Sequence, residues 1–247
     1  MSYRMQCAEI WGGIDNTDEV IETAALKASI YVRSAEGGKG GDIYYFSACG
    51  ADYLTRIAVA DVMGHGKEVS QVSDWVYKGL KDHINDMQAD DIVSRLNNMV
   101  EKRGLEAMTT IVLASMVVKQ GQLYFTYAGH PPMMVYHQGR NLWQPAVSPT
   151  GEQGQNLPLG VLQDASYDQT EMQLDPGDKL FIYTDGLLEA PSPDGEQFGR
   201  ERLVETLMQN RDADPGDLKE AVLTRLMEHT SGRTDHDDVT LLAVQAS

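Results

Sequence analysis

The sequence predicts an α+β fold, in which antiparallel sheets are flanked by helices. Segments with strand character come in groups along the chain, whereas βαβ units would alternate single strands with helices. Turn residues such as Asp175-Pro176-Gly177 join neighbouring strand segments over distances that suit hairpins. The 247 residues include 42% hydrophobic and 23% charged residues, which is typical of a globular protein with a sizeable core.

The first half of the chain predicts a strand hairpin followed by two helices. Residues 1–29 carry no pattern that indicates chemistry, and we interpret them as an irregular segment that leads into a strand. Two β-rich segments then flank turn residues, which favours a hairpin made of residues 42–48 and 54–61. Apolar residues next recur at helical spacing, which predicts amphipathic helices over residues 67–87 and 90–102.

The second half predicts further strands, two more helices and a closing strand. Its strand segments are residues 109–118, 122–127, 132–136, 167–174, 178–184 and 239–244. Its helical segments are residues 200–209 and 216–229. Because no stretch has the composition of a linker, we expect one domain over residues 30–247, with residues 1–29 as the N-terminal segment of the same domain.

The charge balance limits the expected partners. The chain has 20 Lys and Arg residues against 37 Asp and Glu residues, a formal net charge of −17. This excludes nucleic acid as an expected partner, because a phosphate backbone requires clustered basic residues. An acidic surface by itself serves solubility, whereas carboxylates at specific positions would indicate bound cations.

The cysteine count and the hydropathy pattern predict a cytoplasmic protein without a membrane anchor. Cys7 and Cys49 are too few for a disulfide framework. No run approaches the roughly 20 apolar residues that a membrane-spanning helix requires.

Aspartates recur at the ends of the predicted strands. Asp42 opens one strand, Asp61 ends the next, and Asp185 ends a later one, while Asp237 and Asp238 precede the last. Strand ends at one edge of a sheet can direct several carboxylates at one point, where they would repel one another unless cations lay among them. Oxygen ligands favour Mg²⁺ or Mn²⁺ over Zn²⁺. Each aspartate taken singly could also be an ordinary turn residue.

Seven short motifs occur in order along the chain: GGD (40–42), DVMGHG (61–66), TT (109–110), AGHPP (128–132), LPLG (157–160), YTDGLLEA (183–190) and DDVTLL (237–242). This ordered set resembles the PPM (type 2C) metal-dependent protein serine/threonine phosphatases, in the bacterial branch of stage II sporulation and sigma-factor-regulating phosphatases. The resemblance extends from about residue 30 to the C-terminus. It implies an αββα sandwich, with two antiparallel sheets face to face, helices outside and a two-metal site at one edge.

The resemblance also implies roles for individual residues. The implied metal ligands are Asp42, Asp61, Val62, Asp185, Asp237 and Asp238, and the catalytic aspartates are Asp61, Asp185 and Asp237. Asp61 resembles the aspartate that bridges both metals, and Val62 a ligand that uses its main-chain carbonyl. Asp238 stands where many relatives have Asn, so we rank Asp237 first. Asp42 resembles the first acidic position, as a direct ligand or through water.

The implied reaction is direct hydrolysis of a phosphoester by water that two divalent cations, Mn²⁺ or Mg²⁺, activate. Neither cysteine begins a C-x₅-R phosphatase loop, which agrees with a mechanism without a covalent intermediate. His65 and His130 are interpreted as structural, in a glycine-rich turn and before two prolines. Arg33 and Lys39 are candidate phosphate contacts because of their proximity to Asp42.

Three functions are open at this point. The first is hydrolysis of phosphoserine or phosphothreonine on a regulatory protein, such as an anti-anti-sigma (STAS-type) regulator. The second is a catalytically weak module of the same fold that serves partner switching, which the intact aspartates disfavour. The third is a hydrolase of small phosphoesters. The expected partners are a phosphorylated protein substrate and an upstream regulatory protein, and homodimerisation is open.

Overall fold

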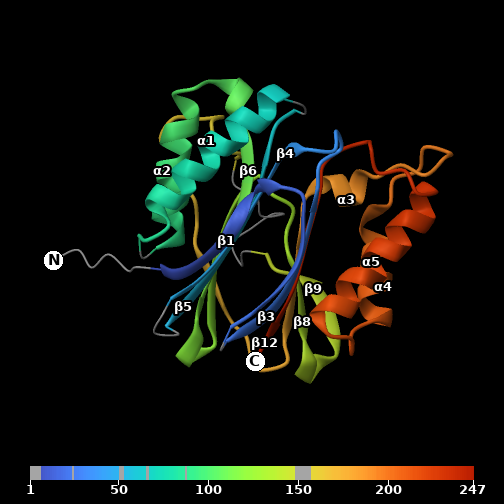
Figure 1. The fold of residues 1–247 in the computed structure, drawn as a ribbon. Helices are drawn as coiled ribbons and strands as arrows, with labels where there is room; N and C mark the ends of the chain where they lie inside the picture. The colour runs from blue at the N-terminus through green and yellow to red at the C-terminus, as the bar shows by residue number, and fades with distance from the viewer. Residues whose placement is uncertain (1–6, 24, 50–52, 65–66, 87, 148–156) are drawn as a thin grey trace. The chain divides into compact units, whose positions relative to one another are not determined.

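The structure, a computed structural model, describes residues 7–23, 25–49, 53–64, 67–86, 88–147 and 157–247. Its contacts divide the chain into two compact units, each built from separate pieces of sequence. Unit 1 comprises Met1–Ile14, Gly40–Pro132 and Val147–Gln173, and unit 2 comprises Asp15–Lys39, Met133–Ala146 and Leu174–Ser247. Each unit has its own sheet and its own helices (Figure 1).

The sheet of unit 1 has the strand order β1-β4-β5-β6-β7-β10. Its strands are β1 (Cys7–Asp15), β4 (Lys39–Cys49), β5 (Leu54–Val62), β6 (Thr109–Val117), β7 (Gln122–Ala128) and β10 (Thr170–Gln173). Helices α1 (Lys67–His83) and α2 (Ala89–Glu101) lie side by side against this sheet (Figure 1). A short 3-10 turn, η1 (Leu105–Ala107), leads from α2 into β6.

Alternation along the strands decides which residues of unit 1 lie under the helices. Ala58, Ala60 and Val62 of β5 share one buried cluster with apolar residues of both helices, among them Val76, Leu80, Ile92 and Leu96. Since side chains alternate along a strand, Asp61 lies on the other face of the sheet. The helical spacing that predicts α1 and α2 is therefore the spacing that buries them.

The sheet of unit 2 has the strand order β2-β3-β12-β11-β8-β9. Its strands are β2 (Thr17–Glu22), β3 (Leu26–Arg33), β8 (Met134–His137), β9 (Leu142–Pro145), β11 (Lys179–Tyr183) and β12 (Val239–Ala246). Its helices are α3 (Asp185–Glu189), α4 (Gly199–Gln209) and α5 (Pro215–Thr230), with α4 and α5 packed together and α5 against β3 and β12 (Figure 1). The 3-10 turn η3 (Gln138–Arg140) closes the hairpin β8–β9 of this sheet. The corresponding turn in unit 1 is η2 (Val118–Gln120), which closes the hairpin β6–β7.

The predicted α+β class is confirmed, and the described strand pairings are antiparallel. The predicted hairpin of residues 42–48 and 54–61 is confirmed as the pair β4–β5. Among the described residues, no helix is both long and apolar enough to cross a membrane. The cytoplasmic location and the single domain stay predictions.

The interpretation of residues 1–29 as irregular before one strand is wrong for residues 7–22, which form β1 and β2. Gly12 interrupts the β pattern of β1. The fold requires glycine at this position, because a Cβ atom there would lie 2.8 Å from the main-chain oxygen of Tyr44 on β4. β2 is an edge strand with mostly exposed acidic and polar residues, so it lacks the apolar alternation that marks a covered strand.

Several predicted boundaries also differ. Helix α1 ends at His83, before the predicted end at residue 87. Just after this end, buried Arg56 donates hydrogen bonds to the main-chain oxygens of Ile84 and Asp86. Strand β10 begins at Thr170 because Tyr167 points to α2, where its hydroxyl donates to Asn97 at 3.1 Å. Two short elements were not predicted, namely β9 and α3. Both fall below the length at which periodicity is informative.

Candidate functional site

Two carboxylates face each other on neighbouring strands of unit 1. Asp42 on β4 lies directly opposite Asp61 on β5, and Thr110 on β6 lies directly opposite Asp61 on its other side. Asp42 is therefore inside its strand rather than at the start, because Lys39, Gly40 and Gly41 belong to β4. Directly opposed residues have Cβ atoms about 4.5–5.5 Å apart, where like charges destabilise a sheet. This arrangement favours a positive charge beside the pair.

The chain leaves the sheet immediately after Asp61. Val62 is the last residue of β5, and its side chain is buried in the cluster under the helices, so only its main-chain oxygen is suited to bind a cation. The N–H of Met63 donates to the oxygen of Met108 at 2.9 Å, and Gly64 has a φ of 100°. His65, predicted to shape this turn, lies outside the described residues.

In unit 2, two loops bring Asp185 close to Asp237. Asp185 is the first residue of α3, and it follows Thr184 rather than ending the strand as predicted. Thr184 and Thr240 tie the loops together: the N–H of Thr184 donates to the Thr240 oxygen, and the N–H of Thr240 donates to the Thr184 hydroxyl, both at 3.0 Å. His236 adds a third bond, from its Nε2–H to the oxygen of Gly186 at 2.8 Å.

Gly186 allows these loops to approach closely. A Cβ atom at this position would lie 2.0 Å from the main-chain oxygen of Asp238 and 3.4 Å from the Cβ of Asp237. Any other residue would therefore separate the two loops. The glycine that the motif places after Asp185 is required by this contact.

The environment of Asp237 disfavours its ionised form. Burial raises the pKa of this carboxyl, and the neighbouring charges of Asp185 and Asp238 raise the pKa further. The N–H of Asp238, which donates to Asp237 Oδ1 at 2.8 Å, acts in the opposite direction, as does His236. A divalent cation beside these carboxylates would relieve the repulsion.

Asp238 is buried, with 5% of its surface exposed, and its Oδ1 accepts a hydrogen bond from the N–H of Ala35 at 2.8 Å. This bond anchors the segment after β3 to the loop before β12. That Asp237, rather than Asp238, is the main ligand of this motif stays a prediction.

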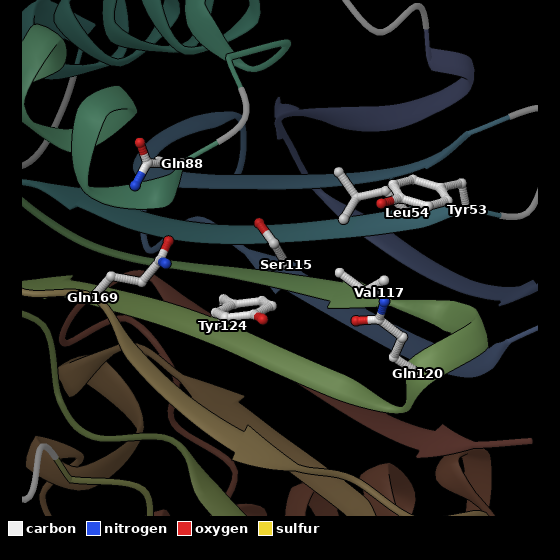
Figure 2. A pocket seen from close by; sticks show the side chains of 8 residues that line it. All are labelled: Tyr53, Leu54, Gln88, Ser115, Val117, Gln120, Tyr124 and Gln169. Carbon is white, nitrogen blue, oxygen red and sulfur yellow. The ribbon is translucent and has the colours of Figure 1, made fainter.

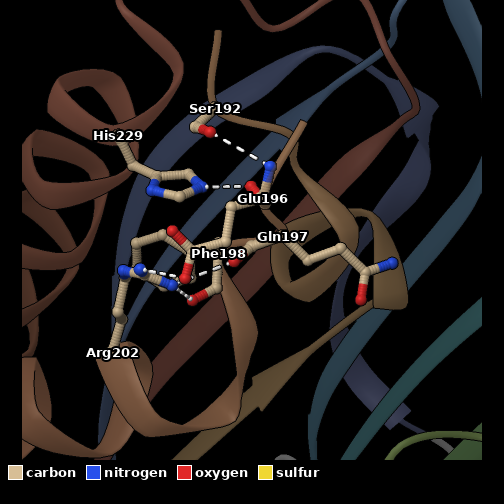
Figure 3. Close-up of polar contacts among 6 residues, drawn as sticks. All are labelled: Ser192, Glu196, Gln197, Phe198, Arg202 and His229. Carbon is tan, nitrogen blue, oxygen red and sulfur yellow. Dashed lines mark hydrogen bonds and ion pairs between the residues drawn. The ribbon is translucent and has the colours of Figure 1, made fainter. Parts of the chain in front are cut away.

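The segment that follows α3 is held by an arginine on α4. Arg202 donates to the main-chain oxygens of Gln197 and Phe198, each at 3.0 Å, and forms an ion pair with Glu196 at 2.6 Å (Figure 3). His229 of α5 donates to the oxygen of Glu196 at 2.8 Å, and its ring contacts Phe198 edge to face. These contacts fix the hairpin of residues 190–198, which we call the α3 hairpin, and with it the far end of α3.

His130 is fully buried, and its Nδ1–H donates to the oxygen of Pro131 at 2.9 Å. Burial lowers the pKa of His130 to about 4. The imidazole is therefore neutral near pH 7 and cannot serve as a general acid there. The structural role predicted for His130 is supported.

The structure brings the predicted site residues together as two sets, one within each unit. Asp42, Asp61 and Val62 form the set of unit 1, and Asp185, Asp237 and Asp238 form the set of unit 2. Within the described ranges, no three His, Cys, Asp or Glu side chains lie close enough to hold a metal ion by themselves. The donor set still fits a hard divalent cation, because it consists of carboxylates, including an opposed pair and one with a raised pKa.

His236 and Arg202 were not predicted from the sequence. His236 stands directly before the last aspartate motif, so its position was a usable signal. The partners of Arg202 lie only four to six residues before it, but no sequence pattern marked the segment before α4 as a hairpin.

Comparison with known proteins finds a matching family model and several bacterial relatives. The family model described as stage II sporulation protein E (SpoIIE) matches residues 52–247. Phosphoserine phosphatase RsbU of Bacillus subtilis is 27% identical over 173 residues, which cover 68% of this chain and 49% of RsbU. The chain spans 22–49% of the length of the curated relatives that it matches.

Two solved structures show the same fold. The RsbU and RsbW domains of Rv1364c from Mycobacterium tuberculosis superpose with a TM-score of 0.76 at 24% identity, over 94% of this chain and 61% of that one. RsbX in complex with magnesium superposes with a TM-score of 0.66 at 21% identity, over 94% of this chain and 100% of that one.

Proposed function

Because the chain belongs to the stage II sporulation protein E family, we propose that it is a metal-dependent protein phosphatase acting on phosphoserine or phosphothreonine. The observation that carries this proposal is the pair of carboxylate sets, Asp42 opposite Asp61 and Asp185 beside Asp237, which occupy the motif positions for metal ligands. RsbU, a relative, is named a phosphoserine phosphatase. The substrate we propose is a phosphorylated regulatory protein of the anti-anti-sigma (STAS) type.

We assign metal-ligand roles to the residues of both carboxylate sets on the basis of the motif order. The proposed ligands are the side chains of Asp42, Asp61, Asp185, Asp237 and Asp238 and the main-chain oxygen of Val62. Oxygen donors of this kind suit Mg²⁺ or Mn²⁺, and a relative of the same fold, RsbX, was solved with magnesium. When bound, such cations lower the pKa of water and neutralise charge on phosphate.

The chain's own residues orient the site. The Thr184–Thr240 bonds and the His236–Gly186 bond hold Asp185 and Asp237 at a fixed separation. Arg33 ends β3 directly opposite Val239, so this exposed cation stands next to the last aspartate motif, where we propose that it contacts the substrate phosphate.

The net reaction needs no covalent enzyme intermediate. A water oxygen attacks phosphorus, the bond from phosphorus to the serine or threonine oxygen breaks, and that oxygen takes up a proton. The products are inorganic phosphate and the free hydroxyl. His130 cannot supply the proton at neutral pH, because burial keeps it neutral.

The test compares hydrolysis of a phosphoserine peptide and of para-nitrophenyl phosphate with Mn²⁺, with Mg²⁺ and with chelator. We expect Asp185→Asn to lower kcat/KM by at least about 100-fold, because it removes a ligand charge. Asp82→Asn is the matched control, since Asp82 is an exposed residue of α1, and it should leave kcat/KM unchanged.

Other outcomes identify the other functions. Hydrolysis that neither chelator nor Asp185→Asn reduces would overturn the metal-dependent mechanism. Hydrolysis of para-nitrophenyl phosphate with no activity on any phosphoprotein would indicate a small-phosphoester hydrolase. A folded protein inactive under every condition would indicate a partner-switching module.

A further inference from the structure

A cavity of about 250 Å³ lies in unit 1 at the ends of β5, β6 and β7 that are far from Asp61 (Figure 2). Its lining residues are Tyr53, Leu54, Gln88, Ser115, Val117, Gln120, Tyr124 and Gln169. Leu54 begins β5 and Asp61 stands seven positions later, which at the rise of a strand separates them by roughly 23 Å. The two residues also lie on opposite faces of the sheet, so the cavity is separate from the carboxylates.

Ser115 carries the strongest indication that the cavity binds something. Only 3% of this residue is exposed, and its hydroxyl has no hydrogen-bond partner among the residues that the structure describes. A buried hydroxyl without a partner costs free energy, so such groups are rare unless a water or a ligand completes them. Ser115 lies directly opposite Tyr124 on β7 and stands at the centre of the residues labelled in Figure 2.

Three glutamines, Gln88, Gln120 and Gln169, also line the cavity. Gln169 accepts a hydrogen bond from the N–H of Ala89 through its Oε1 at 3.0 Å, which fixes the amide and leaves its NH₂ group as a donor. Gln88 precedes α2, and its side chain makes no capping hydrogen bond to the helix. The cavity therefore offers both donors and acceptors next to the ring of Tyr124 and the apolar side chains of Leu54 and Val117.

The residues that line the cavity favour an uncharged ligand. None of the eight described lining residues is Asp, Glu, Lys or Arg. Arg56, the neighbour of Ser115 on β5, directs its guanidinium to the oxygens of Ile84 and Asp86 instead. A charged ligand would lose hydration here without gaining an ion pair, which disfavours phosphates and carboxylates.

We propose that this cavity is a binding site for an uncharged planar ring that carries amide or amine groups at its edge, as nucleobases do. An aromatic ring of the protein stacks on such a compound, and a glutamine amide can form a paired hydrogen bond with its edge. The volume, slightly below that of typical sites for drug-sized ligands, suits one or two fused rings. Such a ligand supplies a hydrogen-bond partner for the buried Ser115 hydroxyl.

The test titrates the full chain with adenine, uracil and nicotinamide, and with benzoate as a charged ring, by calorimetry and by NMR of the backbone amides. At least one uncharged probe should bind saturably with a Kd of about 1 mM or tighter, with shifts at residues 115, 124 and 169. The N–H of Ala89 should exchange more slowly in the complex, because the ligand holds Gln169 in place.

Two variants and one control decide whether the cavity is responsible. Ser115→Ala should weaken binding about fivefold to tenfold by removing one hydrogen bond, and Tyr124→Leu about tenfold by removing the stacking ring. The melting temperature of unliganded Ser115→Ala should be unchanged or higher, since an unpartnered hydroxyl is lost. Ser29→Ala is the matched control, because Ser29 in unit 2 is also a buried serine whose hydroxyl has no partner in the described part of the chain, and it should leave binding unchanged.

Three results would overturn the proposal. They are the absence of saturable binding by every uncharged probe, equal binding of benzoate, and an affinity that Ser115→Ala and Tyr124→Leu leave unchanged. A strong loss of unliganded stability in Ser115→Ala would also overturn it, because the hydroxyl would then have a structural partner.

Discussion

Strand register positions the carboxylates of unit 1, whereas loop contacts position those of unit 2. Asp42 and Asp61 face each other because β4 and β5 pair along seven consecutive residue pairs, from Asp42 opposite Asp61 to Ala48 opposite Thr55. A shift of register would turn every side chain of the strand to the other face. Asp185 at the start of α3 and Asp237 in the loop before β12 are instead brought together by contacts that depend on Gly186, His236 and the threonine bonds.

This difference determines how each set can fail. The strand pair is supported by many backbone hydrogen bonds, so single changes nearby should affect it little. The loop pair is supported by a few individual contacts, each of which one substitution can remove. The following predictions test that contrast, and all concern the loop set or its supports.

The largest effect is expected for Gly186→Ala. The added Cβ would lie 2.0 Å from the Asp238 oxygen, so the loops must separate. We expect the free energy of unfolding to fall by about 1–3 kcal/mol. Phosphatase activity should fall about 100-fold, because Asp185 moves relative to Asp237. Urea unfolding and kcat/KM measure the two effects.

Gly139→Ala is the control for this substitution. A Cβ at Gly139 would meet nothing within 4 Å, and its stability and activity should match the wild type. If Gly186→Ala behaved like Gly139→Ala, the loops would tolerate separation and the contrast with the strand pair would be lost.

A smaller effect is expected for Arg202→Gln, which releases the α3 hairpin from α4. Removing the hydrogen bonds to Gln197 and Phe198 should lower the melting temperature by about 2–4 °C. Activity should fall less than in Gly186→Ala, since Asp185 keeps its own loop contacts. Arg225→Gln, which removes only an exposed ion pair with Glu228, should leave the melting temperature unchanged. Equal melting temperatures for the two variants would show that the hairpin is held by other contacts.

The smallest effect concerns pH. The pKa of Asp237 is raised in the folded state, so the native protein binds this proton more tightly than the unfolded chain. The contribution to stability is complete below the unfolded pKa and is lost as pH rises through the folded pKa. In chelator, urea unfolding from acidic to neutral pH should show this loss in the wild type and not in Asp237→Asn. Equal slopes in both proteins would contradict it.

The sequence determined the type and approximate position of most elements. Apolar spacing is a local property, so it predicted α1, α2, α4 and α5 and the hairpin β4–β5 before any contact was known. It also located the aspartates of all four acidic motifs and the glycine that follows Asp185. The edge strands β1 and β2 were not predicted because their pattern of apolar residues is weak. The elements β9 and α3 were not predicted because they are too short for a pattern to be recognised.

Only the tertiary structure decided which residues meet. The opposition of Asp42 and Asp61, the closeness of Gly186 to Asp238 and the bond from His236 to Gly186 each join residues that are far apart in the sequence. The unpartnered hydroxyl of Ser115 likewise becomes meaningful only beside Tyr124 and Gln169. Local propensity specifies the conformation of a segment, but register and side-chain contacts depend on partners that the fold alone brings close.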